Sequence, residues 1–165
     1  MHLLALIFTG VVLLSYGCVF TPTTRTVMFN EDEFRPYAEK GTAIITGDAF
    51  LKTRGGEIRK GAGNTIYLMP VTAYTGEWIA HISMYSYLQI APPDPQYFKY
   101  EKTTTADSDG RFEFTDLPAG QYYVATKIVW EVPSGGGGLS ETGGWTSAKV
   151  QVALGEKKKV VVTGR

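Results

Sequence analysis

Residues 104–124 read TTADSDGRFEFTDLPAGQYYV and contain the clearest strand and turn pattern of the chain. Asp109-Gly110 is a typical pair for a hairpin turn. Phe112 and Phe114 follow at a spacing of two, which places both rings on one face of a strand. Leu117-Pro118-Ala119-Gly120 then marks a second turn. The stretch therefore predicts antiparallel strands whose aromatic side chains enter a core.

The same alternation of apolar and polar residues continues on both sides of this stretch. We expect a long strand from Ala43 to Leu51, with Gly47 as a bulge, and a shorter strand over 65–69 that ends at Pro70. Short strands between frequent turn signals, with little helical periodicity, predict an all-β protein built as an antiparallel β-sandwich. A last strand is expected over 160–162, and the further core-facing residues are Tyr122, Val124, Ile128, Trp130, Ala148, Val150, Val152 and Leu154.

The opening stretch resembles the signature of carboxypeptidase regulatory-like domains in its D-G, F-x-F and L-P-x-G-x-Y elements. These domains have a transthyretin-like (prealbumin-like) fold, so the resemblance implies a seven-stranded Greek-key sandwich, and Gly120 is expected to need an unusual φ. The likeness extends over residues 41–163, apart from an insert, and includes the strand IYLMP at 66–70. Such domains are non-catalytic modules of many proteins, so the resemblance indicates a fold and not an activity.

The insert, residues 74–100, carries seven aromatic side chains. A short helix with Thr75 as its N-cap would place several of them on one face, and the prolines from Pro92 onward would end it. Two interpretations stay open. The helix covers the sandwich, or it presents an aromatic surface to a protein, peptide or glycan. The candidate binding residues are Tyr74, Trp78, Tyr85 and Trp145.

A second feature is the glycine-rich segment at 135–138, followed by Gly143-Gly144 and Trp145. It does not continue as Gly-Lys-Ser/Thr, and no helical pattern opens after it, which argues against a phosphate-binding loop. We expect a flexible connection between two strands, and the alternative is a mobile recognition loop that carries Trp145.

The N-terminal region indicates where in the cell the protein is located. Residues 3–14 are almost wholly apolar, a length typical of a secretory signal, because a membrane-spanning helix needs about 20 residues. Cys18, the only cysteine, follows a glycine and resembles the lipobox cysteine of bacterial lipoproteins, although Ser15 stands where Leu is usual. The resemblance implies removal of 1–17, lipidation of Cys18 and, because Val19 and not Asp follows, delivery to the outer membrane. The alternative is an ordinary signal peptide or a signal anchor.

These patterns divide the chain into three segments. Residues 1–17 are the predicted lipoprotein signal peptide, 18–40 a lipidated tether, and 41–165 the β-sandwich with its insert at 74–100. The tether has no sustained apolar period and its second half is charged, so we expect an exposed spacer with room for one docked turn.

Composition excludes several classes of function. The 16 basic and 16 acidic residues give a net charge of zero, which argues against a nucleic-acid partner. Removal of the signal would leave His81 as the only histidine, and the chain has no H-E-x-x-H motif for a zinc peptidase. Asp107-x-Asp109-Gly110 lacks the remaining ligands of an EF-hand. We therefore expect neither a metal nor another cofactor.

The sequence thus predicts a non-catalytic cell-envelope lipoprotein, held in the membrane by its lipid anchor, whose sandwich binds or assembles with a protein or glycan partner. The first alternative is a glycan- or peptidoglycan-binding module that uses exposed aromatics. The second alternative is a hydrolase that uses His81.

Overall fold

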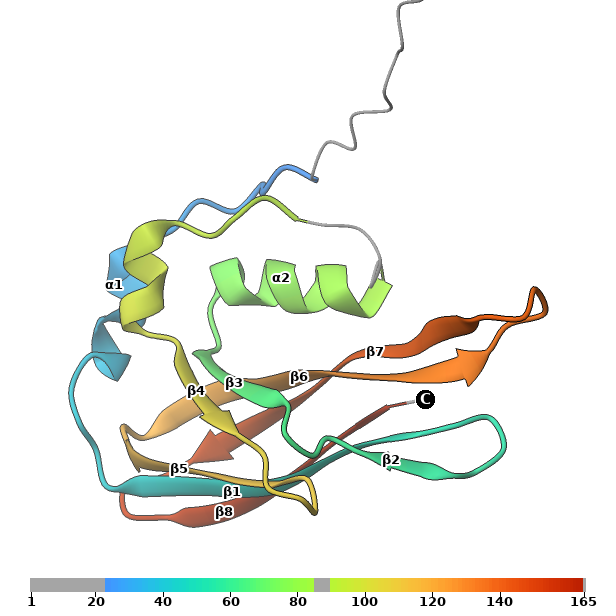
Figure 1. The fold of residues 1–165 in the computed structure, drawn as a ribbon. Helices are drawn as coiled ribbons and strands as arrows, with labels where there is room; N and C mark the ends of the chain where they lie inside the picture. The colour runs from blue at the N-terminus through green and yellow to red at the C-terminus, as the bar shows by residue number, and fades with distance from the viewer. Residues whose placement is uncertain (1–22, 85–89, 165) are drawn as a thin grey trace, which may run out of the picture.

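The computed structural model describes residues 23–84 and 90–164, and these form eight strands in two facing sheets (Figure 1). This confirms the all-β sandwich, but with eight strands in place of the seven expected. One pair of strands is also parallel, whereas all pairs were expected to be antiparallel. Two short strands, at residues 58–60 and 102–105, carry too few residues to show an alternating pattern of their own.

The first sheet is arranged around β1 (Ala43–Lys52). On one side β1 pairs in parallel with β8 (Lys157–Gly164). On the other side its first half pairs with β5 (Arg111–Leu117) and its end with β2 (Ile58–Lys60), both antiparallel. The first and last strands of the sandwich are therefore neighbours, and their pairing holds the C-terminal strand beside the first one.

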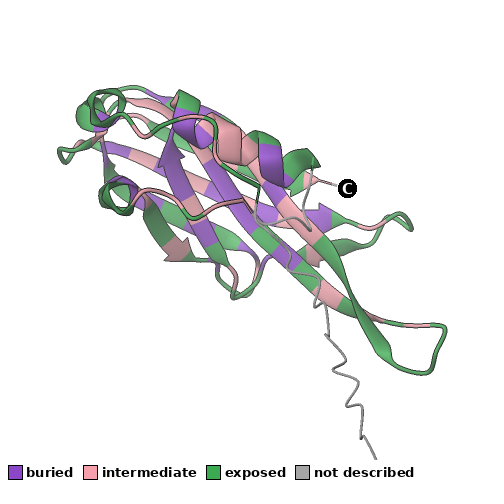
Figure 2. Ribbon diagram, turned by 90° about the horizontal axis from the view of Figure 1, so that it is seen from above, coloured by how far each residue is buried: buried purple, intermediate pink, exposed green. Residues whose placement is uncertain are grey.

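The second sheet has the order β4-β3-β6-β7, and all its pairs are antiparallel. Its strands are β4 (Lys102–Thr105), β3 (Thr65–Pro70), β6 (Gly120–Pro133) and β7 (Leu139–Val152). β6 and β7 form a long hairpin whose far end is exposed and projects beyond the sandwich (Figure 2). This agrees with the expectation that the glycines at 135–138 connect two strands.

The main core lies between the two sheets and contains the side chains that the alternation placed there. Phe112, Phe114 and Leu117 of the opening stretch are all buried in it. Leu154 is an exception: it follows the end of β7 and is 75% exposed. The other buried members from the predicted strands are Ala43, Ile45, Ala49, Leu51, Ile66, Leu68, Tyr122, Val124, Ile128, Val150, Val152 and Val162.

The turn at Asp107–Gly110 connects the two sheets and does not close a hairpin. β4 pairs with β3 in the second sheet, whereas β5 pairs with β1 in the first. The Asp107 carboxylate accepts hydrogen bonds from the backbone N–H groups of Asp109 (2.8 Å) and Arg111 (2.9 Å), which fixes the crossing. The local turn signal was correct, but the partner of each strand depends on segments far away in the chain.

Two glycines have roles other than those expected. Gly47 is not a bulge, because the register shift of β1 lies between Ala43 and Ile45. A Cβ at Gly47 would instead collide with the ring of Phe112. Gly120 does not have a positive φ. A Cβ there would lie 2.6 Å from the ring of Tyr37. Both positions are glycine because another group packs directly on the backbone.

A layer of helices covers the outer face of the second sheet (Figure 1). It consists of α1 (Glu31–Phe34), η1 (Arg35–Tyr37), α2 (Ala73–Met84) and η2 (Pro95–Lys99). The covering interpretation of the insert is therefore confirmed for its described residues. No helix among the described residues is long and apolar enough to cross a membrane.

Helix α2 begins earlier than the sequence predicted. Its first residue is Ala73, and Thr72 precedes it in the cap position that had been assigned to Thr75. The Thr72 hydroxyl accepts from the Thr75 N–H (3.2 Å), and the Thr75 hydroxyl accepts from the Thr72 N–H (3.0 Å). This reciprocal pair resembles a capping box, which explains why two threonines three residues apart start the helix.

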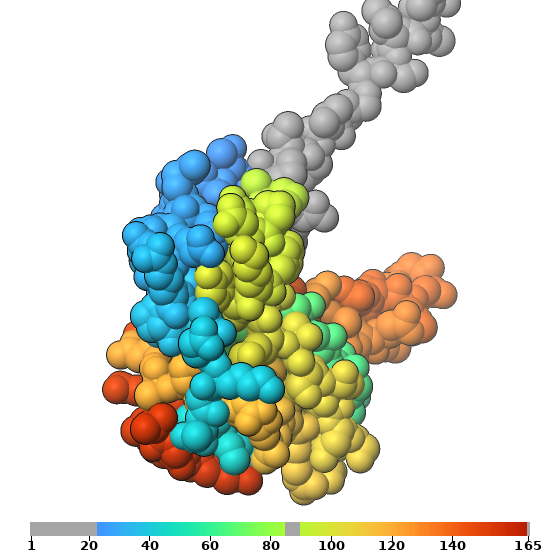
Figure 3. Space-filling view, turned by 90° about the vertical axis from the view of Figure 1, so that its left-hand side faces the viewer, coloured from blue at the N-terminus to red at the C-terminus, as the bar shows by residue number. Residues whose placement is uncertain are grey.

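Residues 23–40 do not form a free spacer, contrary to the tether prediction. Figure 3 shows this segment packed beside residues 90–100. Phe34 is fully buried, and its ring lies 5.1 Å from the rings of Phe29 and Tyr100. The charged residues of α1 face solvent, so the segment looked exposed although its aromatic residues anchor it. The predicted signal peptide and Cys18 lie outside the described residues.

Candidate functional site

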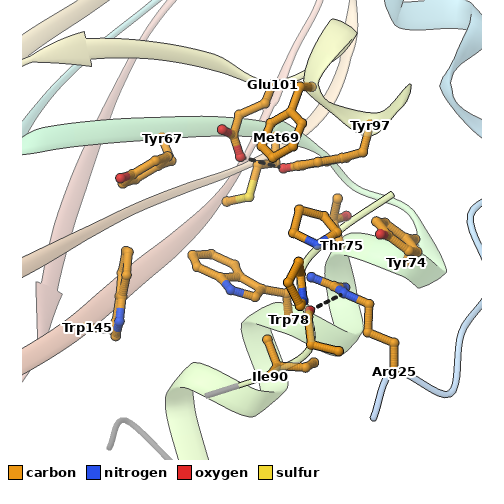
Figure 4. Close-up of a pocket in the computed structure, with 14 residues that line it drawn as sticks. Arg25, Tyr67, Met69, Tyr74, Thr75, Trp78, Ile90, Tyr97, Glu101 and Trp145 are labelled. Carbon is orange, nitrogen blue, oxygen red and sulfur yellow. Dashed lines mark hydrogen bonds between the residues drawn. The ribbon is translucent and has the colours of Figure 1, made fainter. Parts of the chain in front are cut away.

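An open cleft of about 260 Å³ lies between α2, η2 and the outer face of the second sheet (Figure 4). Strands β3 and β7 contribute its floor, α2 contributes one wall, and residues 90–93 and the segment at Arg25 contribute the other. The side chains that line it are mostly apolar or aromatic, with two charged groups among them. They include Arg25, Tyr67, Met69, Trp78, Pro92, Tyr97, Phe98, Glu101 and Trp145.

Three aromatic rings surround the open space. Trp78 and Trp145 meet edge to face, with ring centroids 5.1 Å apart and planes at 80°. The ring centroid of Tyr67 lies 5.8 Å from that of Trp145. The three rings come from α2, β7 and β3, and Figure 4 shows them around the space between helix and sheet. Each is only partly buried, so the cleft presents aromatic surface that a ligand can contact.

Arg25 places a positive charge in the wall of the cleft. Its Nε donates to the backbone carbonyl of Ala91 (3.0 Å), and its guanidinium carbon lies 4.6 Å from the ring centroid of Tyr74. Its Nη1 lies 3.9 Å from Glu77 Oε2. These two atoms are buried and have no hydrogen-bond partner among the described residues, so their charges balance without a direct bond. Arg25 is thus fixed in place by three different groups.

Glu77 also fastens the N-terminal strap, which we define as residues 23–29. Its Oε1 accepts hydrogen bonds from the N–H and the hydroxyl of Thr26, each at 2.6 Å, and from the N–H of Val27 (3.3 Å). Partial burial acts to raise the pKa of Glu77, but these bonds and the Arg25 charge lower it overall. The carboxylate therefore stays ionised and holds the strap against α2.

A second carboxyl group lies deeper, at the opposite side of the cleft. The Tyr97 hydroxyl donates to Glu101 Oε2 (2.8 Å) (Figure 4). Burial raises the pKa of Glu101, against the hydrogen bond from Tyr97, which lowers it. Burial and then the Glu101 charge raise the pKa of Tyr97 well above its ordinary range, so the phenol keeps its proton. Glu101 supplies hydrogen-bonding oxygen to a cleft that is otherwise mostly apolar.

The predicted binding residues separate into two groups. Trp78 and Trp145, distant in sequence, meet in the cleft as described above. Tyr74 also lines the cleft but is only 3% exposed. Its hydroxyl accepts from the N–H of Asp94 (2.7 Å), and its ring packs in the buried cluster between the helical layer and the second sheet. Tyr85 lies outside the described residues. Trp145 belongs to β7, opposite Lys127, which corrects the alternative that placed it on a mobile loop.

Tyr67, Arg25 and Glu101 are among the lining residues that sequence reasoning did not single out. Tyr67 alternates with the buried Ile66 and Leu68, so its position on the outer face could have been inferred from period two. Arg25 gave no such signal, because it reaches the cleft through a contact with Ala91, which is distant in sequence. No local pattern marked Glu101, which lines the cleft beside Tyr97. His81, the residue of the hydrolase alternative, is buried in α2 and does not line the cleft.

Comparisons with known proteins give structural likenesses and no match to a family or a curated protein. A crystal structure of a candidate carbohydrate-binding protein from Pseudomonas aeruginosa is similar over 82% of this chain and 97% of that one, with a TM-score of 0.74 and 29% sequence identity. The major pilin subunit BcpA of Bacillus cereus matches over 74% of this chain and 30% of that one, with a TM-score of 0.42 and 14% identity.

The fold and the cleft together fit a class of protein, the β-sandwich binding module. A rigid double sheet carries the site, and the ligand surface is built on strands and a helix rather than on loops alone.

Proposed function

We propose that the protein is a non-catalytic glycan-binding module. The observation that carries this proposal is the open cleft of about 260 Å³ with Tyr67, Trp78 and Trp145 around it. Sugar rings have apolar C–H faces that gain by leaving water for an aromatic surface, while their hydroxyls need hydrogen-bonding partners. Glu101 and Arg25 provide such partners at the two sides.

The size of the cleft favours a short stretch of a glycan. Small-molecule pockets usually enclose about 300–1,000 Å³, so this cleft is at or below the lower end of that range. It is open to solvent along one side, which lets a longer chain enter and leave. The sequence led us to expect a module that binds or assembles with a protein or glycan, and of these partners we propose a glycan. The likeness to a candidate carbohydrate-binding protein supports that choice.

We further propose that the module works in the cell envelope. The apolar run at 3–14 and the single cysteine at 18 are the sequence features behind this, and they imply a lipid anchor. The module itself would not be an enzyme. The described residues that line the cleft include no histidine and no serine.

The test is a calorimetric titration of the full-length chain in detergent with soluble oligosaccharides, including peptidoglycan fragments and β-linked glucan oligomers. Trp78→Ala and Trp145→Ala should each weaken binding at least about tenfold, the loss expected when an aromatic anchor is truncated. Trp78→Phe keeps an aromatic face and should bind within a few-fold of wild type.

Leu154→Ala is the control, since Leu154 is exposed and outside the cleft. Chromatography of the recovered oligosaccharide should show it uncleaved. Absence of binding to every oligosaccharide at millimolar concentration, in a protein that circular dichroism shows to be folded, would contradict the proposal.

A further inference from the structure

A second hollow of about 310 Å³ lies at the outer edge of β7, and it shares Trp145 with the aromatic cleft. We call it the β7-edge hollow. Its lining comes from the end of α2, from β6 and β7, and from the turn that follows β1. The lining residues include Lys52, Arg54, Trp130, Gly143, Gly144 and Trp145.

The β7-edge hollow has aromatic surface of its own. Trp130 is partly exposed, and the Arg59 guanidinium carbon lies 5.7 Å from its ring centroid. A Cβ at Gly143 would lie 2.7 Å from the same indole, so glycine at this position lets the strand pass directly beside the ring. Positions 143 and 144 of β7 therefore carry no side chains, and Trp130 and Trp145 both line the hollow beside them.

Trp145 links the two spaces. On one side it contacts Trp78 and Tyr67 in the cleft, and on the other it lines the hollow together with Trp130. A chain of sugars bound in the cleft and extending past Trp145 would thus enter a second space with the same kind of aromatic wall. A single bound sugar would leave this second space empty.

The two spaces differ in charge. The cleft has one cation and one carboxyl group, Arg25 and Glu101. The β7-edge hollow has Lys52 and Arg54 and no acidic residue among its lining side chains. Lys52 and Arg54 are both exposed, and neither forms an ion pair with any described residue. Two unpaired cations beside an aromatic wall attract an anion.

We infer that the β7-edge hollow is the anionic subsite of the glycan cleft, and that the ligand is an acidic oligosaccharide. Its uncharged part lies against Trp78 and Tyr67, and a carboxylate on a following sugar is bound by Lys52 and Arg54. Arg54 can bind such a carboxylate through two parallel hydrogen bonds. The inference rests on the proposed glycan function and adds the chemical class of the sugar.

The experiment compares a matched pair of ligands on the full-length chain in detergent: a tetramer of β-linked galactose, and the same tetramer with galacturonic acid in place of its last galactose. Wild type should bind the acidic tetramer about tenfold more tightly, the effect expected for one hydrogen bond between charged groups. Lys52→Gln with Arg54→Gln should remove that advantage and leave binding of the neutral tetramer unchanged. The advantage should also fall as salt is added.

The control is Lys99→Gln with Lys102→Gln, which removes the same charge from exposed residues that line neither space. This control should keep the preference for the acidic tetramer. An equal loss in both double variants would assign the preference to the net charge of the protein and overturn the inference.

Three further outcomes separate the two proposals. Equal binding of both tetramers, lost in Trp78→Ala, would overturn the anionic subsite and leave the glycan function standing. Binding of free galacturonic acid or phosphate as tight as the tetramer, and unaffected by Trp78→Ala, would show an isolated anion site and overturn the shared groove. Binding of neither tetramer nor any other oligosaccharide would overturn both.

Discussion

At Gly47 the ring of Phe112 occupies the space that any other residue's side chain would need. A Cβ at this position would collide with that ring and lie 2.5 Å from the backbone oxygen of Val160. β8 and β5 pair with β1 on its two sides, so the backbone cannot move away. Gly47→Ala should therefore destabilise the fold by about 1–3 kcal/mol, the usual cost of overpacking a core. Urea denaturation followed by circular dichroism measures it.

Gly135→Ala is the matched control for this substitution. A Cβ at Gly135 would meet no atom within 4 Å, and its φ is not positive. Its effect should stay within about 0.5 kcal/mol, as for most surface changes. Equal stability of Gly47→Ala and wild type would mean that the Phe112 ring can move, and that the packing described for this part of the core is not tight.

Single residues also mark where sequence reasoning succeeded and where it failed. Phe112, Phe114 and Leu117 could be placed in the core because period two is a local property of a strand. Gly47 and Gly120 could be recognised as special, but not for the right reason. Their function depends on which group packs on them, and for Gly120 that is Tyr37, far earlier in the chain.

At the scale of elements, the N-terminal strap depends on one carboxylate. The Glu77 carboxylate accepts hydrogen bonds from the N–H groups of Thr26 and Val27. Partial burial acts to raise the pKa of Glu77, but these bonds and the Arg25 charge lower it overall. A carboxyl group with a lowered folded-state pKa contributes stability above its unfolded pKa. That contribution is lost as the pH falls through the lowered value. The strap should therefore detach in acid before the sandwich unfolds.

Hydrogen exchange of the Thr26 and Val27 amides, corrected for the intrinsic rate at each pH, measures this. Protection should be high at neutral pH and fall below the ordinary pKa of glutamate. Glu77→Gln should exchange faster at neutral pH and show little further change in acid, because its side chain does not titrate. Glu57→Gln is the control, since Glu57 pairs with Arg59 and does not contact the strap. Protection that is independent of pH in wild type would contradict the role given to Glu77.

The elements that could be predicted are those with a long local period. The strands of the hairpin β6–β7 and the helix α2 were expected, because each repeats its pattern over many residues. The docked segment at 23–40 was missed. Only a few aromatics anchor it within a run of charges, and a single turn of helix shows no period. The burial of Phe34 depends on Phe29 and Tyr100, which a local pattern does not reveal.

At the scale of the molecule, the candidate site depends on topology. Trp78 and Trp145 belong to different elements and meet because β7 pairs with β6 in one register and α2 crosses above them. The sequence indicated both tryptophans as candidate binding residues, but it did not predict that they are in contact. The second sheet, the helical layer and the strap all contribute to the lining of the cleft, and none of them forms it alone.

The strap also connects the cleft to the predicted anchor. Thr23 pairs with Ile90, and Ala91 donates to the Thr23 carbonyl (2.8 Å), so the described chain begins at the wall of the cleft. Four residues lie between Cys18 and Thr23, and the five steps from one to the other span at most about 18 Å. A lipid on Cys18 would therefore keep the cleft near the membrane surface.

Intact mass and membrane fractionation of wild type and Cys18→Ser in a Gram-negative host test this placement. Wild type should carry acyl groups and sediment with membranes, since two or more chains give stable anchoring. Cys18→Ser should lose both properties and still bind oligosaccharide in detergent, because Cys18 precedes every residue of the cleft. A soluble, unacylated wild-type product would contradict the anchor. The cleft would then bind its ligand free of the membrane, and the glycan test above would decide its function.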